Sequence, residues 1–171
     1  LGMGAVTSFL LGMGMTVSAC YIFLAIILGP ALIGAGLDPI ASHLFILYWG
    51  MLSFITPPVA LAAVAAAIIA KADPMAIGVR AMRLGLINFI LPFIFVLNPA
   101  LVLRGEWSEI VVIVPACVAA VWLMASSFEG YLYRVGIIGL SIRGPLLVAA
   151  ALLLYPEIWS YIAGLIVIAG C

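Results

Sequence analysis

An uncharged stretch of 29 residues, at positions 42–70, constrains the fold more than any other feature, because two adjacent prolines lie at its middle. A straight helix of this length would be about 43 Å long, whereas the hydrocarbon core of a bilayer is roughly 30 Å thick. Pro57 and Pro58 have no backbone N–H, so the carbonyls of Ser53 and Phe54, four residues earlier, lose their helical partners. The stretch therefore predicts two half-helices.

The break between these half-helices has two interpretations. Non-helical backbone at membrane depth needs protein, water or an ion to satisfy its carbonyls, and secondary transporters use half-helices of this kind to bind ions and substrates. Alternatively, the break is a proline kink in which the hydroxyls of Ser53 and Thr56 replace the lost hydrogen bonds. Thr56 precedes a proline, which favours extended backbone, but the residues alone leave both interpretations open.

The composition places the whole chain in a membrane. Of its 171 residues, 68% are hydrophobic and 7% are charged, against roughly 45–50% apolar and about 25% charged in soluble domains. Six Lys and Arg balance six Asp and Glu, which leaves no basic surface for nucleic acid. At roughly 20 residues per span, we expect an all-α integral membrane protein with about five or six membrane segments.

A glycine-rich segment near the start of the chain is the second interruption. Gly12, Gly14, Thr16 and Ser18 place flexible backbone and hydroxyls inside an apolar region. Thr16 or Ser18 is suited to cap a following helix, whose N-terminus would favour a carboxylate. We expect a re-entrant hairpin with its tip at 12–16. The alternative is a helix interface in which small residues allow close packing.

The remaining charges divide the rest of the chain. Further membrane segments are expected at about 84–103 and 110–126, and an interfacial stretch at 126–134 is rich in aromatic and charged residues. The last part, 135–171, holds Arg143 and Glu157 and predicts one or two helices. Because the connection at 71–83 carries three basic residues, we expect it to be cytoplasmic.

Taken together, these segments resemble a known family. The sequences GMGMTVSACYI, ASHLFILYWGMLSFITPPVALAA, KADPMAIGVRAMRLGL and FVLNPAL, within residues 12–103, are similar to the large membrane subunit of TRAP (tripartite ATP-independent periplasmic) transporters. The similarity looks closest to fused permeases of the TAXI-associated type. It implies part of a sodium-driven, elevator-type importer of small organic acids in the bacterial inner membrane, supplied by a periplasmic substrate-binding protein and completed by the remainder of the permease chain.

The resemblance also implies a binding site. It makes the glycine-rich segment a hairpin tip and the proline segment a helix break, both beside the sodium and substrate sites. The residues it assigns to substrate or ion are Gly12, Gly14, Met15, Thr16, Ser18, Gly50, Ser53, Phe54, Thr56, Pro57 and Pro58. Sodium would be held by backbone or hydroxyl oxygens of Ser53, Phe54 and Thr56, with no other cofactor. Similar chains carry Pro-Thr-Thr where this chain has Thr16-Val17-Ser18, which leaves open the hydroxyl that touches the ligand.

The expected organisation has two parts: residues 1–103 form the end of the transport domain, and residues 104–171 form the membrane tail of the fused permease. Because the chain starts at Leu1, inside apolar sequence, we expect it to be a piece of a longer polypeptide. The alternative function is a non-transporting helical scaffold of a membrane complex. A membrane enzyme is a third possibility, but no hydrolase motif or intramembrane acid–base pair supports catalysis.

The other candidates have simpler explanations. His43 follows Asp38 near a membrane boundary, where a local hydrogen bond explains it better than a proton relay. Arg143 is suited to extend towards the cytoplasmic surface. The isolated cysteines predict neither zinc nor a disulfide. The further residues considered are Cys20, Cys117 and Cys171; Arg80 and Arg83 as headgroup anchors; Asn88, Asn98, Pro92 and Pro99 in a span; and Trp107, Trp159 and Tyr161 as belt residues.

Overall fold

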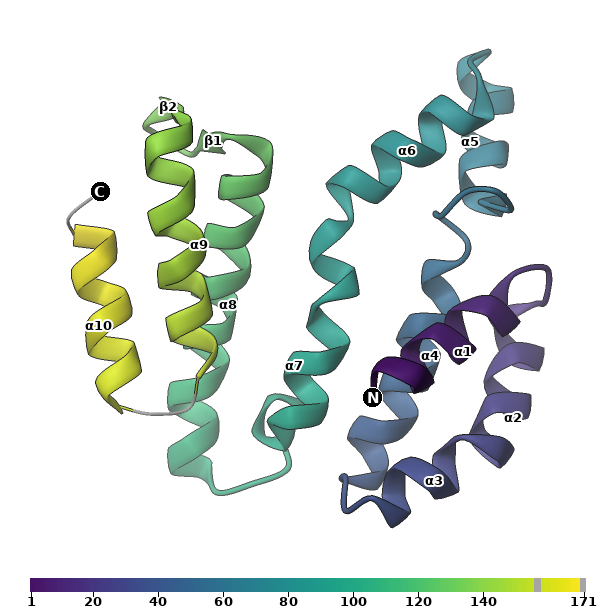
Figure 1. The fold of residues 1–171 in the computed structure, drawn as a ribbon, viewed down its shortest axis with the longest axis horizontal. Helices are drawn as coiled ribbons and strands as arrows, with labels where there is room; N and C mark the ends of the chain where they lie inside the picture. Colours follow the sequence, from purple (N-terminus) through teal and green to yellow (C-terminus); the bar gives the residue numbers. More distant parts are fainter. Residues whose placement is uncertain (156–157, 170–171) are drawn as a thin grey trace. The chain divides into compact units, whose positions relative to one another are not determined.

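A computed structural model describes residues 1–155 and 158–169 and is mostly helical (Figure 1). The chain divides into two compact units, Leu1–Leu97 and Asn98–Cys171. Each unit is considered by itself. Glu157 and Cys171 lie outside the described residues.

The first unit consists of short helices. They are α1 (Gly2–Gly12), α2 (Val17–Ile27), α3 (Gly29–Gly34), α4 (Pro39–Leu52), α5 (Leu61–Ala70), α6 (Pro74–Leu84), the 3-10 turn η1 (Leu86–Phe89) and α7 (Leu91–Leu97). In Figure 1 the purple pair α1 and α2 forms a bent hairpin that lies against α4. The break predicted in the proline segment is present, since residues 53–60 separate α4 from α5.

Local side-chain chemistry sets several of the helix starts. The dipeptide Asp-Pro begins both α4 and α6: Oδ1 of Asp38 accepts hydrogen bonds from two amides of the first turn, and Oδ2 of Asp73 accepts one from Ala76 at 2.7 Å. A proline at the first helical position has no amide to leave unpaired. Thr16 caps α2 by accepting a hydrogen bond from Ala19 at 3.3 Å, so it is the capping residue of the two that were considered.

The number of membrane segments differs from the expectation of five or six. Among the described residues, one helix, α8 (Trp107–Glu129), is long and apolar enough to cross a bilayer by itself. Helices α5 and α6 would pass that test only as a pair, and they are bent by 119°. Five other apolar helices have 10–17 residues and are too short.

Glycine and proline explain this difference. The apolar stretch 17–37 is divided at Gly29-Pro30, and the expected span 84–103 consists of two 3-10 turns on either side of the seven-residue helix α7. The second of these turns, η2 (Pro99–Val102), begins at a proline that has no amide to continue α7. Apolar composition marked these regions correctly as hydrophobic, but it does not report where the backbone bends.

The core of the first unit lies between α1, α4 and the η1–α7 segment. Phe45 and Ile46 of α4 are fully buried. Trp49 makes edge-to-face contacts with Phe9, Phe89 and Phe93, with ring centroids 5.6–6.3 Å apart. Such aromatic pairs add roughly 0.5–1.5 kcal/mol each beyond their burial. This cluster fixes the orientation of α4 just before the break begins.

The second unit is a helical hairpin with an additional helix. It contains η2, α8, a two-stranded antiparallel hairpin of β1 (Tyr131–Leu132) and β2 (Gly136–Ile137), α9 (Leu140–Leu154) and α10 (Ile158–Ala169). Helix α9 packs against both α8 and α10. The last part of the chain, 135–171, therefore contains two helices, which is one of the two outcomes expected from the sequence. The small sheet departs from an all-α fold. Helix α8 ends at Gly130, whose φ is positive, and Arg134 and Gly136 also have positive φ in the hairpin that follows.

Removal of the α6 cap should destabilise that helix. We expect Asp73→Ala to lower the free energy of unfolding by about 1 kcal/mol, because the Ala76 amide loses its acceptor. Asp73→Asn keeps a capping oxygen and should stay close to wild type. Amide hydrogen exchange over 74–78 in the detergent-solubilised complete permease would measure the change. Equal protection in the Ala and Asn variants would contradict this role.

Candidate functional site

The end of α1 lies directly against the end of α4. A β-carbon added at Gly12 would lie 2.5 Å from the carbonyl oxygen of Gly50 and 2.9 Å from Oγ of Ser53. Real side chains do not make such contacts, so the two backbones approach this closely only because residue 12 is glycine. The structure therefore brings three of the expected site residues together: Gly12 from the hairpin, Gly50 from the last turn of α4, and Ser53 from the start of the break.

The second arm of the hairpin reaches the same turn of α4. A β-carbon at Gly50 would lie 3.1 Å from Sγ of Cys20, which is a buried residue of α2. Gly50 is thus enclosed by α1 on one side and by α2 on another. Both arms hold the last turn of α4 immediately before its helical hydrogen bonds end.

The backbone hydrogen bonds at the break follow the two prolines. Among the described residues, no backbone amide donates to the carbonyl of Ser53, whose helical partner would be Pro57. The carbonyl of Phe54 also loses its helical partner, but it accepts a hydrogen bond from Ala62 of α5 at 3.0 Å instead. One bond thus links the two half-helices across the break, and the carbonyl of Ser53 keeps both of its lone pairs.

Two buried hydroxyls complete the polar lining of the break. Oγ of Ser53 donates to the carbonyl of Gly50 and Oγ1 of Thr56 donates to that of Leu52, both at 2.8 Å. These hydroxyls therefore bond carbonyls of the preceding turn and do not replace the bonds lost at the carbonyls of Ser53 and Phe54, and the helix is not continuous through residues 53–60. Because each hydroxyl uses its proton to donate, its oxygen still offers lone pairs to a cation.

The far end of the break is held by α6. A β-carbon at Gly78 would lie 2.9 Å from Cγ of Pro57, so the proline ring packs directly on the backbone of this helix. Ala60, which closes the break, is buried and has a φ of +36°, unusual for a residue other than glycine. Left-handed backbone of this kind costs of order 1–3 kcal/mol and persists only where the surroundings impose it.

The hairpin tip is more open than the break. Gly14 has a φ of +89° and turns the chain where glycine is favoured, with no atom within 4 Å of an added β-carbon. Thr16 and Ser18 are exposed and Met15 is partly buried. The first turn of α2 therefore presents amides and hydroxyls at the surface of this unit, an arrangement that attracts a carboxylate.

The oxygen atoms at the break are suitable ligands for a hard monovalent cation. Among the described residues, no group of three or more His, Cys, Asp or Glu side chains could hold a metal ion. The break offers carbonyl and hydroxyl oxygens from Ser53 and Thr56, both buried, and Phe54 adds a carbonyl that is already bonded. Unwound carbonyls of this type coordinate sodium in secondary transporters. The set of oxygens fits sodium and does not resemble a transition-metal site.

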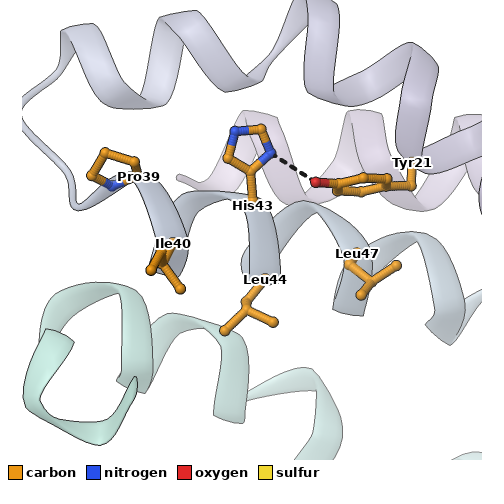
Figure 2. Close-up of a pocket in the computed structure, with 6 residues that line it drawn as sticks. All are labelled: Tyr21, Pro39, Ile40, His43, Leu44 and Leu47. Atoms are coloured by element: carbon orange, nitrogen blue, oxygen red, sulfur yellow. Dashed lines mark hydrogen bonds between the residues drawn. The ribbon is translucent and has the colours of Figure 1, made fainter. Parts of the chain in front are cut away.

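His43 is engaged elsewhere. Figure 2 shows its Nδ1 bonded at 3.2 Å to the hydroxyl of Tyr21, beside a pocket of about 270 Å³. Its ring also lies against Gly29, where a β-carbon would be 3.4 Å from the imidazole. A hydrogen bond between helices, to α2, therefore accounts for this histidine. The pocket is otherwise lined by apolar side chains of α4, namely Pro39, Ile40, Leu44 and Leu47.

A second pocket lies against the break. It measures about 330 Å³ and is lined by Tyr48, Met51, Leu52, Ile55 and Asn88. Asn88 is therefore close to the end of α4, whereas Asn98, the other asparagine of the expected span, belongs to the other unit. In that unit Arg143 does not extend freely: its Nε donates to the carbonyl of Ile138 at 3.2 Å.

Three contributors to the site were missed by sequence reasoning. Gly78 could have been noticed, because a glycine inside an amphipathic helix costs about 1 kcal/mol relative to alanine and implies close packing. Cys20 and Ala60 carry no such signal, since an alanine or a cysteine in an apolar run is ordinary. Their roles depend on tertiary contacts with Gly50 and on backbone geometry.

Comparison with known proteins identifies one family. Residues 1–110 match the family model described as the tripartite ATP-independent periplasmic transporter, DctM component. The matched region contains both Gly12 and the break. Searches of the curated proteins and of the solved structures give no match.

Filling the contact between hairpin and break should be costly. We expect Gly12→Ala to reduce the free energy of unfolding by about 1–3 kcal/mol, because its methyl group would overlap the carbonyl of Gly50. Gly34→Ala is the matched control, since a β-carbon there meets no atom within 4 Å. Thermal unfolding of the complete permease in detergent would compare the two variants. Similar melting temperatures for both would refute the close approach.

Proposed function

The chain belongs to the DctM component family of the tripartite ATP-independent periplasmic transporters, and on this premise we propose that it couples the import of a small organic acid to sodium. Membership in this family makes the chain part of a membrane transporter, the large subunit of a TRAP system. A transporter family does not favour the scaffold alternative or an enzyme. The sodium coupling, the carboxylate substrate and an elevator-type movement are our proposals.

One observation carries the sodium proposal. The carbonyl of Ser53 has no backbone donor within the described residues, and it lies in a buried turn against Gly12 of the hairpin. An unpaired buried carbonyl is costly unless a cation or water satisfies it. A bound sodium ion would relieve that cost. Its ligands would be this carbonyl, the hydroxyls of Ser53 and Thr56, and the second lone pair of the Phe54 carbonyl oxygen.

The carboxylate proposal rests on the hairpin tip. Thr16 caps α2, and the first amides of that helix follow beside the exposed hydroxyl of Ser18. A helix start favours anions through its unpaired amides and its dipole. No Lys or Arg lies in residues 1–70, so no basic side chain of this segment competes with the helix start for an anion. Gly14 and Met15 would shape the approach of the substrate to it.

The partners and the setting belong to the same proposal. A periplasmic substrate-binding protein would deliver the organic acid, and the remainder of the permease chain would supply the other half of the site. We place the protein in the bacterial inner membrane with 71–83 on the cytoplasmic side. We also propose that 1–103 completes the transport domain and that 104–171 is the tail of a fused permease of the TAXI-associated type.

Uptake measurements test the sodium site. The complete permease, reconstituted in proteoliposomes with its binding protein, should accumulate substrate only with an inward sodium gradient. The triple variant Thr56→Val, Pro57→Ala, Pro58→Ala restores helical donors and removes one hydroxyl, so we expect it to abolish sodium-dependent uptake. Pro145→Ala, inside α9 of the other unit, is the control and should keep it. Uptake that ignores the gradient, or that survives the triple variant, would refute the proposal.

A pair of buried serines gives a finer test. Ser53→Ala should raise the sodium concentration for half-maximal uptake about tenfold, as expected for losing an interaction of roughly 1.5 kcal/mol with a charged group. Ser126→Ala changes a buried serine of α8, in the other unit, and it should leave the value unchanged. Equal shifts in both variants would indicate a general loss of stability instead of a lost ligand.

A further inference from the structure

The β1–β2 hairpin of the second unit is a small, firmly closed loop. Tyr131 pairs with Ile137 and Leu132 with Gly136. Ile138, which follows β2, is 2% exposed, and its amide donates to the carbonyl of Gly130 at 2.9 Å. These bonds fix the base of the hairpin on the end of α8.

Arg143 secures that base from α9. Its Nε donates to the carbonyl of Ile138, and its guanidinium lies against Gly130, where a β-carbon would overlap it. The hydroxyl of Ser127 donates to the carbonyl of Arg143 at 2.7 Å, which joins α8 to α9 at the same level. The hairpin is therefore held from two helices, and its orientation relative to them is fixed.

The tip of this closed loop carries large side chains that nothing covers within the described residues. Tyr133 is 69%, Val135 68% and Ile137 89% exposed, and Tyr131 is more than half exposed. Arg134 is exposed beside them, with its guanidinium carbon 5.9 Å from the centre of the Tyr133 ring. Two aromatic rings, two aliphatic chains and one cation thus share a rigid protrusion.

The position of the hairpin indicates what covers it. Helix α8 has 23 residues, about 34 Å, and is the one described helix long enough to cross a bilayer alone. No charged residue lies between Glu109 and Glu129 of that helix, and the hairpin follows Glu129 directly. The hairpin consequently lies at the level where hydrocarbon gives way to headgroups. Tyrosines and a neighbouring arginine are typical of that layer.

We propose that the hairpin Tyr131–Ile137 is a membrane-interface anchor that inserts Tyr131, Tyr133, Val135 and Ile137 among the lipid headgroups and places Arg134 on the phosphate of an anionic phospholipid. The anchor holds the end of α8 at a fixed depth. Because its strands have only two residues each, they offer little edge for pairing with another protein chain. The proposal is independent of sodium coupling and of the substrate.

Spin-label accessibility in nanodiscs tests the depth of the tip. The complete permease, with its native cysteines replaced by alanine, carries Tyr133→Cys or, as an exposed reference on α8, Ala125→Cys, each labelled with a nitroxide. At position 133 we expect oxygen, which partitions into lipid, to relax the spin label more strongly than a water-soluble nickel chelate does. The ratio of the two effects should place the label at position 133 at a shallower depth than the label at position 125. Strong relaxation by nickel would place the tip in water, and weak relaxation by both would mean that protein covers it. Either result would overturn the proposal.

The cationic part has its own test. In nanodiscs that mix phosphatidylglycerol with phosphatidylcholine, Arg134→Gln should reduce the preference of the bound lipid for phosphatidylglycerol about fivefold, as expected for one charge at the membrane surface. Arg134→Lys keeps the charge and should keep the preference. Lipid composition, measured by mass spectrometry after extraction, gives the readout. An unchanged preference in Arg134→Gln would overturn the assignment of the phosphate contact.

Discussion

Two backbones meet at Gly12 and Gly50 with no side chain between them, and most features of the first unit depend on this contact. It sets the direction in which α1 and α4 run past each other, since Gly4 near the start of α1 lies against Phe45. It also brings the hairpin to the turn where α4 loses its hydrogen bonds. Helices α1 and α2 thus cover the turn at which the polar break begins.

The break itself shows how a membrane protein deals with two consecutive prolines. The carbonyl of Phe54 accepts a hydrogen bond from the amide of Ala62, and the hydroxyls of Ser53 and Thr56 donate to carbonyls of the preceding turn. Within the described part of the chain, the carbonyl of Ser53 has no backbone donor. Among the described residues, no carboxylate takes part in these bonds. With so few charges in the chain, backbone and hydroxyl oxygens are the chemistry available at this depth.

Features that depend on local chemistry could be predicted from the sequence, whereas those that depend on packing could not. The break follows from the missing amides of Pro57 and Pro58, and the start of α2 follows from the hydroxyl of Thr16. The bond between Phe54 and Ala62 joins residues eight apart, and the support of Pro57 by Gly78 requires α6 to fold back; neither leaves a local pattern. Counting apolar residues also overestimated the continuous spans, because hydrophobicity carries no information about bends.

The absence of a β-carbon at Gly12, Gly50 and Gly78 has a consequence for how this chain tolerates change. At each of these positions an added β-carbon would lie 2.5–3.1 Å from another atom, so substitutions should be poorly tolerated there. At Gly34 and Gly144, by contrast, an added β-carbon would face open space. A saturation library over residues 1–97 should therefore accept many substitutions at the exposed apolar positions and almost none at these three. The map of tolerated variation would trace the close contacts of α1, α4 and α6 around the break.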